Sequence, residues 1–130
     1  MNRKIEFRAK RINNGEWVYG YLTKREYKLK SAWFDRYFID GHHVEVATIG
    51  QFTGLLGRNR QRIFEGDIIK IAAGWSYGNQ YVVKWITQEC GFLLVSDMNY
   101  APWIKYTLSN LEIIGNIHDN PELIGGGKWQ

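Results

Sequence analysis

The sequence predicts a mainly β protein, with an N-terminal β lobe and a small C-terminal β domain. Three observations support this fold class. Aromatic residues make up 15% of the chain and are typical of strands. Fourteen glycines against two prolines indicate many turns. Several short runs alternate apolar and polar residues, a period of two that places each set on one face of a strand. With 130 residues, the chain can bury a hydrophobic core.

An antiparallel hairpin is predicted near the N-terminus. Ile5, Phe7 and Ala9 alternate with charged residues, so they share one face of a half-buried strand. The run Asn13–Gly15 follows, and Asn and Gly tolerate the positive φ that tight hairpin turns need. We therefore expect Glu16–Thr23 to fold back as the partner strand. Its side chains would alternate, with Trp17, Tyr19 and Tyr21 on one face and Val18 and Leu22 on the other.

The rest of the N-terminal lobe has a less regular pattern. Lys24–Lys30 is charged and lacks a turn residue. Ala32–Ile39 is aromatic and alternates poorly, which leaves a strand and an irregular ribbon both open. The pair Asp40-Gly41 predicts a turn, and Val44–Ile49 returns to a strand-like pattern.

A glycine-rich segment, residues 51–66, is expected to connect the N-terminal lobe, residues 1–50, with a C-terminal region, residues 67–130. Whether these parts form one structural unit stays open. Gly54 and Gly66 are the glycines we expect to shape turns, and Glu65–Asp67 should lead directly into a strand at Ile68–Ala72.

Further apolar runs predict C-terminal strands at Tyr81–Ile86, Phe92–Val95, Ile104–Leu108 and Leu111–Ile117. Short strands joined by turns are typical of a small barrel or a strongly bent sheet, and we expect an SH3-like β-barrel. Asn120 before Pro121 is a helix-start signal. Three consecutive glycines from Gly125 limit this short C-terminal helix to about one turn.

Charge and composition narrow the functional classes. Seventeen Lys and Arg against thirteen Asp and Glu give a net charge of +4, which favours polyanions but is also common for solubility alone. The single cysteine, Cys90, excludes an internal disulfide. No apolar run approaches the roughly 18 residues of a membrane span, and the first residues do not resemble a signal peptide. We expect a cytoplasmic protein without a membrane anchor.

Three arginines and a lysine are the main candidates for binding: Arg58, Arg60, Arg62 and Lys70. If the loop is extended, alternation puts the three guanidinium groups on one side, which suits contacts with phosphates. The alternative is a solvated loop whose charges serve solubility or pair with acidic residues.

Aromatic residues in two predicted loops form a second set of candidates. They are Trp75, Tyr77, Tyr100 and Trp103, with Tyr106 nearby. Their rings could stack on bases or anchor a protein partner. Alternatively, they close over the core or lie in a subunit interface.

The sequence shows no set of residues for catalysis, metal binding or a cofactor. His42 and His43 are adjacent, so a strand would point them to opposite faces. The glycines at positions 50, 54 and 57 lack the lysine and the helix of a phosphate loop. We expect no metal and no cofactor.

The remaining reactive residues have simpler structural explanations. Cys90 lies in a predicted turn with no neighbouring base. Glu65 and Asp67 could divide acid and base roles, but turn chemistry also explains them, with Asp67 capping its own backbone and Glu65 staying in water. His118 is far from both along the chain.

Several blocks, in this order along the chain, resemble the YopX family of phage and prophage proteins. They are the opening IEFRAKR with Tyr19–Tyr21, the block Gly50–Leu55, the turn Phe64–Ile68, and the close Ile114–Ile117 with Asn120–Leu123. The resemblance implies a small, β-rich, self-associating protein without an established biochemical activity. The segment Gly57–Arg62 departs from the family's Asn-Gly turn and is more basic, and Arg25–His43 shows no family pattern.

Together these observations predict a phage accessory protein that acts by binding a host protein or nucleic acid, as a homo-oligomer, and not as an enzyme. The alternative is a small hydrolase or nucleic-acid-processing enzyme that uses Glu65, Asp67 or His118.

Overall fold

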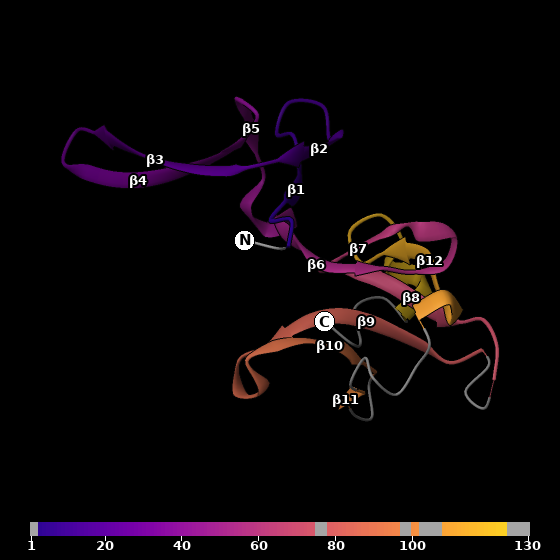
Figure 1. The fold of residues 1–130 in the computed structure, drawn as a ribbon. Coiled ribbons are helices and arrows are strands. Elements are labelled where there is room, and N and C mark those ends of the chain that lie inside the picture. Colours follow the sequence, from indigo (N-terminus) through magenta and orange to yellow (C-terminus); the bar gives the residue numbers. More distant parts are fainter. Residues whose placement is uncertain (1–2, 75–77, 97–99, 102–107, 125–130) are drawn as a thin grey trace. The chain divides into compact units, whose positions relative to one another are not determined.

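The computed structural model describes residues 3–74, 78–96, 100–101 and 108–124, and confirms the mainly β fold. Its strands form three antiparallel sheets (Figure 1). The chain divides into two compact units, Met1–Phe52 and Thr53–Gln130. The predicted connecting segment, residues 51–66, is itself built from strands and a 3-10 turn, and most of it lies in the second unit.

The first unit begins with the predicted hairpin, β1 (Phe7–Lys10) and β2 (Trp17–Gly20). The turn forms as expected: Gly15 has a φ of 72°, and the Glu16 amide donates to Asn14 Oδ1 at 3.0 Å. The polar side of β1 is more buried than alternation suggests, because Arg8 is only 7% exposed. Its guanidinium carbon lies 4.8 Å from the centre of the Trp17 ring, within the range of a cation–π contact.

Lys24–Ile39 is a regular hairpin and not an irregular ribbon. It consists of β3 (Leu22–Leu29) and β4 (Ala32–Ile39), paired over their full length, and β5 (His42–Val44) adds to the base of β4. Lys30 starts the connecting turn with a φ of 58°, although it is neither Gly nor Asn. The predicted Asp40-Gly41 turn is confirmed, with positive φ at both residues.

The core of the first unit lies at the base of this hairpin. Ala9, Ile39 and Val44 are at most 2% exposed and pack together. The predicted strand Val44–Ile49 is partly wrong, since Val46–Thr48 forms a 3-10 turn. Thr48 explains the turn: its hydroxyl donates to the Glu45 carbonyl at 2.7 Å and accepts from the Lys10 amide at 2.9 Å.

Strand β6 (Gly50–Leu56) starts in the first unit, where Gln51 pairs with Phe7 of β1. Its second half belongs to the second unit with its sheet neighbour β7 (Arg62–Phe64). The Thr53 hydroxyl donates to the Ile63 carbonyl at 2.8 Å. A 3-10 turn at Arg58–Arg60 connects the two strands.

Five strands form the main sheet of the second unit, in the order β11-β10-β9-β8-β12. Their bounds are β8 (Asp67–Ile71), β9 (Gln80–Ile86), β10 (Gly91–Val95), β11 (Tyr100–Ala101) and β12 (Leu111–Asn116). Short 3-10 turns occur at Thr87–Glu89 and Leu108–Asn110. Most of the predicted strand Ile104–Leu108 lies outside the described residues. The described strands form no closed barrel, so an SH3-like closure stays a prediction.

Each face of this sheet carries a buried apolar cluster. On one face a cluster forms around Ile69, Val83 and Leu94. On the other, Ile68 and Val82 pack against Ile124 of the predicted C-terminal turn, a single 3-10 turn at Pro121–Ile124. The Asn120 side chain points back along the chain, because its Oδ1 accepts from the Asn116 amide at 3.2 Å.

Candidate binding surface

The structure does not place the three loop arginines on one extended strand. Arg58–Arg60 forms a 3-10 turn in which Asn59 and Arg60 have φ values of 60° and 59°. The loop is therefore not extended. The prediction that the three guanidinium groups line up on one side requires an extended loop and is wrong. All three arginines are nevertheless exposed.

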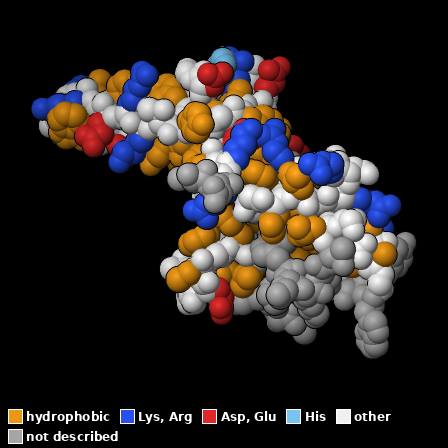
Figure 2. Space-filling view, viewed as in Figure 1, with side chains coloured by type: hydrophobic (Ala, Val, Ile, Leu, Met, Phe, Trp, Pro, Cys, Tyr) orange, Lys and Arg blue, Asp and Glu red, His pale blue; other side chains and the backbone are white. Residues whose placement is uncertain are grey.

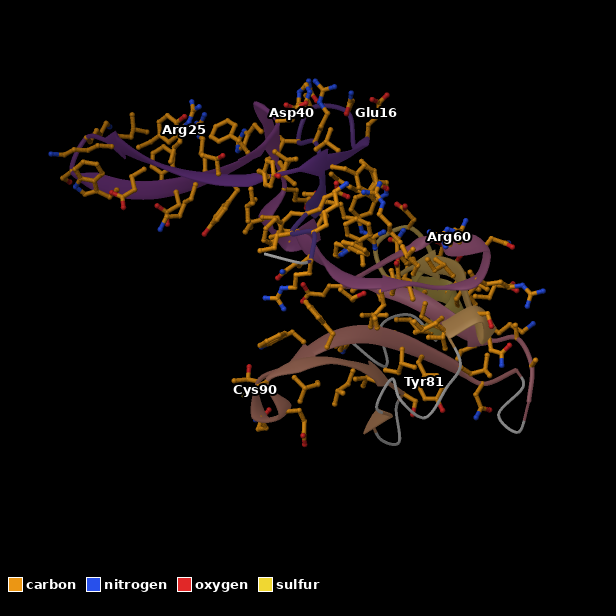
Figure 3. All side chains as sticks on the ribbon, viewed as in Figure 1. Glu16, Arg25, Asp40, Arg60, Tyr81 and Cys90 are labelled. Carbon is orange, nitrogen blue, oxygen red and sulfur yellow. The ribbon has the colours of Figure 1, made fainter. Side chains whose placement is uncertain are left out.

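Two of these arginines have neighbours within the second unit. Arg58 Nε lies 3.9 Å from Glu112 Oε2, and the Arg62 guanidinium carbon lies 5.8 Å from the centre of the Phe64 ring. Lys70 lies opposite Glu112 in the β8–β12 pair. Glu112 therefore offsets part of the positive charge that the sequence places in this region. Arg60 extends outward (Figure 3).

The predicted aromatic candidates fall mostly outside the described residues. This applies to Trp75, Tyr77, Trp103 and Tyr106. Tyr100 begins β11, where its backbone pairs with Val95. These residues stay predictions.

Glu65, Asp67 and His118 come from chain segments that the sheet brings together. Asn116 lies opposite Asp67, and the Ile117 amide donates to the Gly66 carbonyl at 2.9 Å, so the sequence distance between these segments is misleading. Asp67 is 2% exposed, and its Oδ2 accepts from the Phe64 amide at 2.7 Å. This bond is the turn chemistry predicted for Asp67. Glu65 is half-buried, not fully in water as predicted.

The hairpin β3–β4 presents a surface that the sequence patterns did not single out. Figure 1 shows it extending away from β1, β2 and β5 of the same unit, and Figure 2 shows hydrophobic and basic side chains exposed along it. Leu29 and Trp33, close to its turn, are 66% and 65% exposed.

Register assigns the side chains of this hairpin to two faces. Residues directly opposite each other in an antiparallel pair share a face, and faces alternate along each strand. Arg25 faces Arg36, and Tyr27 faces Phe34. We call the face they occupy the arginine–aromatic face; it comprises Arg25, Tyr27, Phe34, Arg36 and Phe38, with Thr23, Leu29 and Ala32 at its two ends.

The arginine–aromatic face is held together by contacts between cations and rings. Tyr27 and Phe34 stack with centroids 5.8 Å apart and an interplanar angle of 20°. The Arg36 guanidinium carbon lies 4.9 Å from the Tyr27 ring centre and 5.4 Å from that of Phe34. Arg25 lies 5.0 Å from the Phe38 ring in the same manner and is labelled on the hairpin in Figure 3. Each distance is within cation–π range.

The opposite face of the hairpin has a different composition. It carries two lysines, two carboxylates and two aromatic residues: Lys24, Glu26, Lys28, Trp33, Asp35 and Tyr37. Its four charged groups sum to zero, whereas the arginine–aromatic face holds two guanidinium groups and no carboxylate. We call this opposite face, with its two lysines and two carboxylates, the mixed-charge face.

Sequence reasoning missed the arginine–aromatic face because its members come from two strands whose pairing was unknown. The available signal was the alternation of Arg25 with Tyr27 and of Phe34 with Arg36 and Phe38. Each run places cations and rings two residues apart, but only a hairpin with a two-residue turn brings both runs to the same face.

Fold and surface together define a small β protein with an exposed hairpin. The chain belongs to the YopX family, since the model of the YopX protein family matches residues 6–125 and therefore nearly the whole chain. The resemblance seen in the sequence is confirmed. No curated protein matches the chain.

One solved structure with a similar fold is that of protein EF1440 from Enterococcus faecalis. The TM-score is 0.56 at 21% sequence identity, and the similarity covers 95% of this chain and 99% of that one. At this identity the likeness shows the fold alone. Among the described residues, none of the helical turns has the length and apolar character needed to cross a bilayer.

Proposed function

We propose that this chain is a phage or prophage accessory protein that acts by binding, as a homo-oligomer in the cytoplasm of the host bacterium, and not by catalysis. The observation that carries the proposal is the exposed β3–β4 hairpin. Its distal half contributes no residue to the buried core of the first unit, yet it keeps large apolar side chains in water. Large apolar side chains that stay in water, on a part of the chain that adds nothing to the core, favour an interaction surface.

Self-association is supported by the tip of the hairpin, which we define as Leu29–Trp33. Leu29 and Trp33 lie on opposite faces of the hairpin, so a second copy that covers both must enclose the tip. Burying both side chains would remove apolar surface from water, worth about 1.5–3 kcal/mol for each large side chain that becomes fully buried.

The hydrolase alternative has weaker support. An acid–base pair must have groups free to reach a substrate. The Asp67 carboxylate is instead buried and holds the Phe64 amide.

Sedimentation velocity at micromolar concentrations tests the self-association. We expect a mass above the 15.3 kDa of one chain, and a shift toward one chain in the double variant Leu29→Ser/Trp33→Ser. The matched control is Tyr21→Ser/Val46→Ser, which replaces two apolar residues of the same unit that are 78% and 60% exposed. A single-chain mass for the unmodified protein at every concentration would count against the oligomer, and an equal shift in both double variants would count against the tip.

A further inference from the structure

We propose that the arginine–aromatic face of the β3–β4 hairpin binds single-stranded nucleic acid, with Arg25 and Arg36 contacting phosphates and Tyr27, Phe34 and Phe38 offering rings to bases. The inference rests on the proposed function, because it names the ligand of the same exposed hairpin. The five named residues lie outside the tip proposed for self-association, which shares only Leu29 and Ala32 with this face.

The two faces of the hairpin differ in charge. The arginine–aromatic face carries two guanidinium groups without a carboxylate, and the mixed-charge face of the same ribbon is neutral. Neither Arg25 nor Arg36 forms an ion pair with a carboxylate in the part of the chain that the structure describes. Because the whole chain also carries a net charge of +4, a polyanion would approach this face without an opposing acidic group.

Arg25 and Arg36 lie directly opposite each other in the β3–β4 pair. Like charges directly across an antiparallel pair destabilise it. Aromatic rings under both guanidinium groups offset part of this cost. A phosphate that contacts both guanidinium groups would offset more of it, since arginine presents several donors to phosphate oxygens in one plane.

Rings and cations alternate along both strands of this face. Successive residues on one face of a strand lie about 6.6 Å apart. The rows Arg25–Tyr27 and Phe34–Arg36–Phe38 thus alternate groups for phosphate and groups for bases along both strands. Proteins that bind single strands combine basic residues with aromatic platforms in this way, and Arg planes can also stack on bases.

A single strand fits better than a duplex. In a duplex the base faces are covered by their stacked neighbours, so exposed rings would have no base face to contact. Phe34 is 37% exposed, and the half-buried Tyr27 ring stacks beside it with the Arg36 guanidinium group over both rings. An unstacked base would therefore contact the exposed part of the Phe34 ring or the guanidinium plane.

The test measures fluorescence anisotropy of a labelled oligodeoxythymidylate with the full-length protein. We expect binding that weakens steeply as salt rises. The double variant Arg25→Ala/Arg36→Ala should weaken binding at low salt by about tenfold or more, and Phe34→Ala by several-fold through lost stacking. Arg25→Lys/Arg36→Lys should recover only part of the affinity, because lysine keeps the charge but lacks the planar group.

Two controls separate the face from overall charge. Lys24→Ala/Lys28→Ala also removes two positive charges, but from the mixed-charge face. It should therefore weaken binding much less than Arg25→Ala/Arg36→Ala does. Arg58→Ala/Arg60→Ala/Arg62→Ala removes three charges from the loop in the second unit. Equal losses in the two hairpin double variants, or full loss in the loop variant alone, would overturn the assignment to the arginine–aromatic face.

The remaining outcomes are equally decisive. Absence of binding at low salt, or tighter binding of a duplex of the same length, would overturn the inference. If sedimentation still showed self-association in that case, the proposed function would stand and a protein would become the ligand of this face. Because Arg25, Phe34 and Arg36 are exposed, their variants should remain folded, as thermal unfolding followed by circular dichroism would verify.

Discussion

Asp67 illustrates at the scale of one residue how a carboxylate can serve the fold. Its Oδ2 accepts the Phe64 amide at 2.7 Å inside the protein, next to Gly66, whose φ is 92°. The Gly66 amide and carbonyl bond to Val83 and to Ile117. This one turn therefore connects β8 to its neighbours on both sides.

Asp67→Ala should lower the free energy of unfolding by about 1–3 kcal/mol, because it leaves the buried Phe64 amide without its acceptor. Urea denaturation measures this change. Asp67→Asn keeps a side-chain oxygen and should cost less. Equal stability of the Ala variant and the unmodified protein would show that the hydrogen bond contributes nothing.

Lys84 is a second residue whose surroundings set a measurable property. Burial in β9 lowers the pKa of its ammonium group below the ordinary value of 10.5. Between the folded pKa and 10.5 the folded state binds fewer protons than the unfolded state, so stability rises with pH in that window. Below the folded pKa both states are protonated, and the full cost of burying the charge remains.

Lys84→Met removes this cost. We expect the stability of the variant relative to the unmodified protein to decrease as the pH rises toward about 10, because deprotonation of Lys84 removes the cost of burying its charge in the unmodified protein. Urea denaturation at several pH values measures it. A difference that stays constant over this range would contradict a lowered pKa.

At the scale of one element, the β3–β4 hairpin is anchored at its base and exposed at its tip. Ile39 is fully buried with Ala9 and Val44, whereas Leu29 at the other end is 66% exposed. The two ends belong to the same pair of strands, and the difference arises from what each end packs against.

Ile39→Ala should therefore lower the free energy of unfolding by about 2–5 kcal/mol, since it opens a cavity in the core of the first unit. Val46→Ala is the control, since its side chain is 60% exposed and lies outside the tip, and it should change the free energy of unfolding by less than about 0.5 kcal/mol. Chemical denaturation of both variants provides the comparison. A similar loss in the two variants would contradict the assignment of Ile39, rather than the exposed Val46, to the core of the first unit.

At the scale of the whole molecule, the proposed self-association would make apparent stability depend on protein concentration. Because only folded chains would associate, a higher protein concentration would favour the folded state. The Tm of the unmodified protein should therefore rise with protein concentration. The Leu29→Ser/Trp33→Ser variant proposed above should flatten this dependence. A Tm independent of concentration in the unmodified protein would agree with a monomer instead.

Much of the backbone could be predicted from local chemistry. The turns at Asn13–Gly15, Asp40-Gly41 and Glu65–Asp67 were all predicted, because positive φ is a property of one or two residues. The turn at Lys30 was not predicted, since lysine does not favour positive φ. Its φ of 58° accompanies the pairing of β3 with β4 on either side of the turn. The Val46–Thr48 turn was also missed, because it depends on side-chain bonds of Thr48.

The sequence alone thus determined the mainly β class, several of the turns and membership of the YopX family, since periodicity, glycine placement and ordered motifs are local features. Only the tertiary structure decided which side chains share a surface. It places Arg58 and Arg60 in a 3-10 turn, with Arg58 beside Glu112, and Arg62 at the start of β7. It also brings Arg25 over Phe38, thirteen positions later in the chain. The physical reason is strand register: one residue of slip would move every side chain of a strand to the other face, and pairing between distant residues sets it.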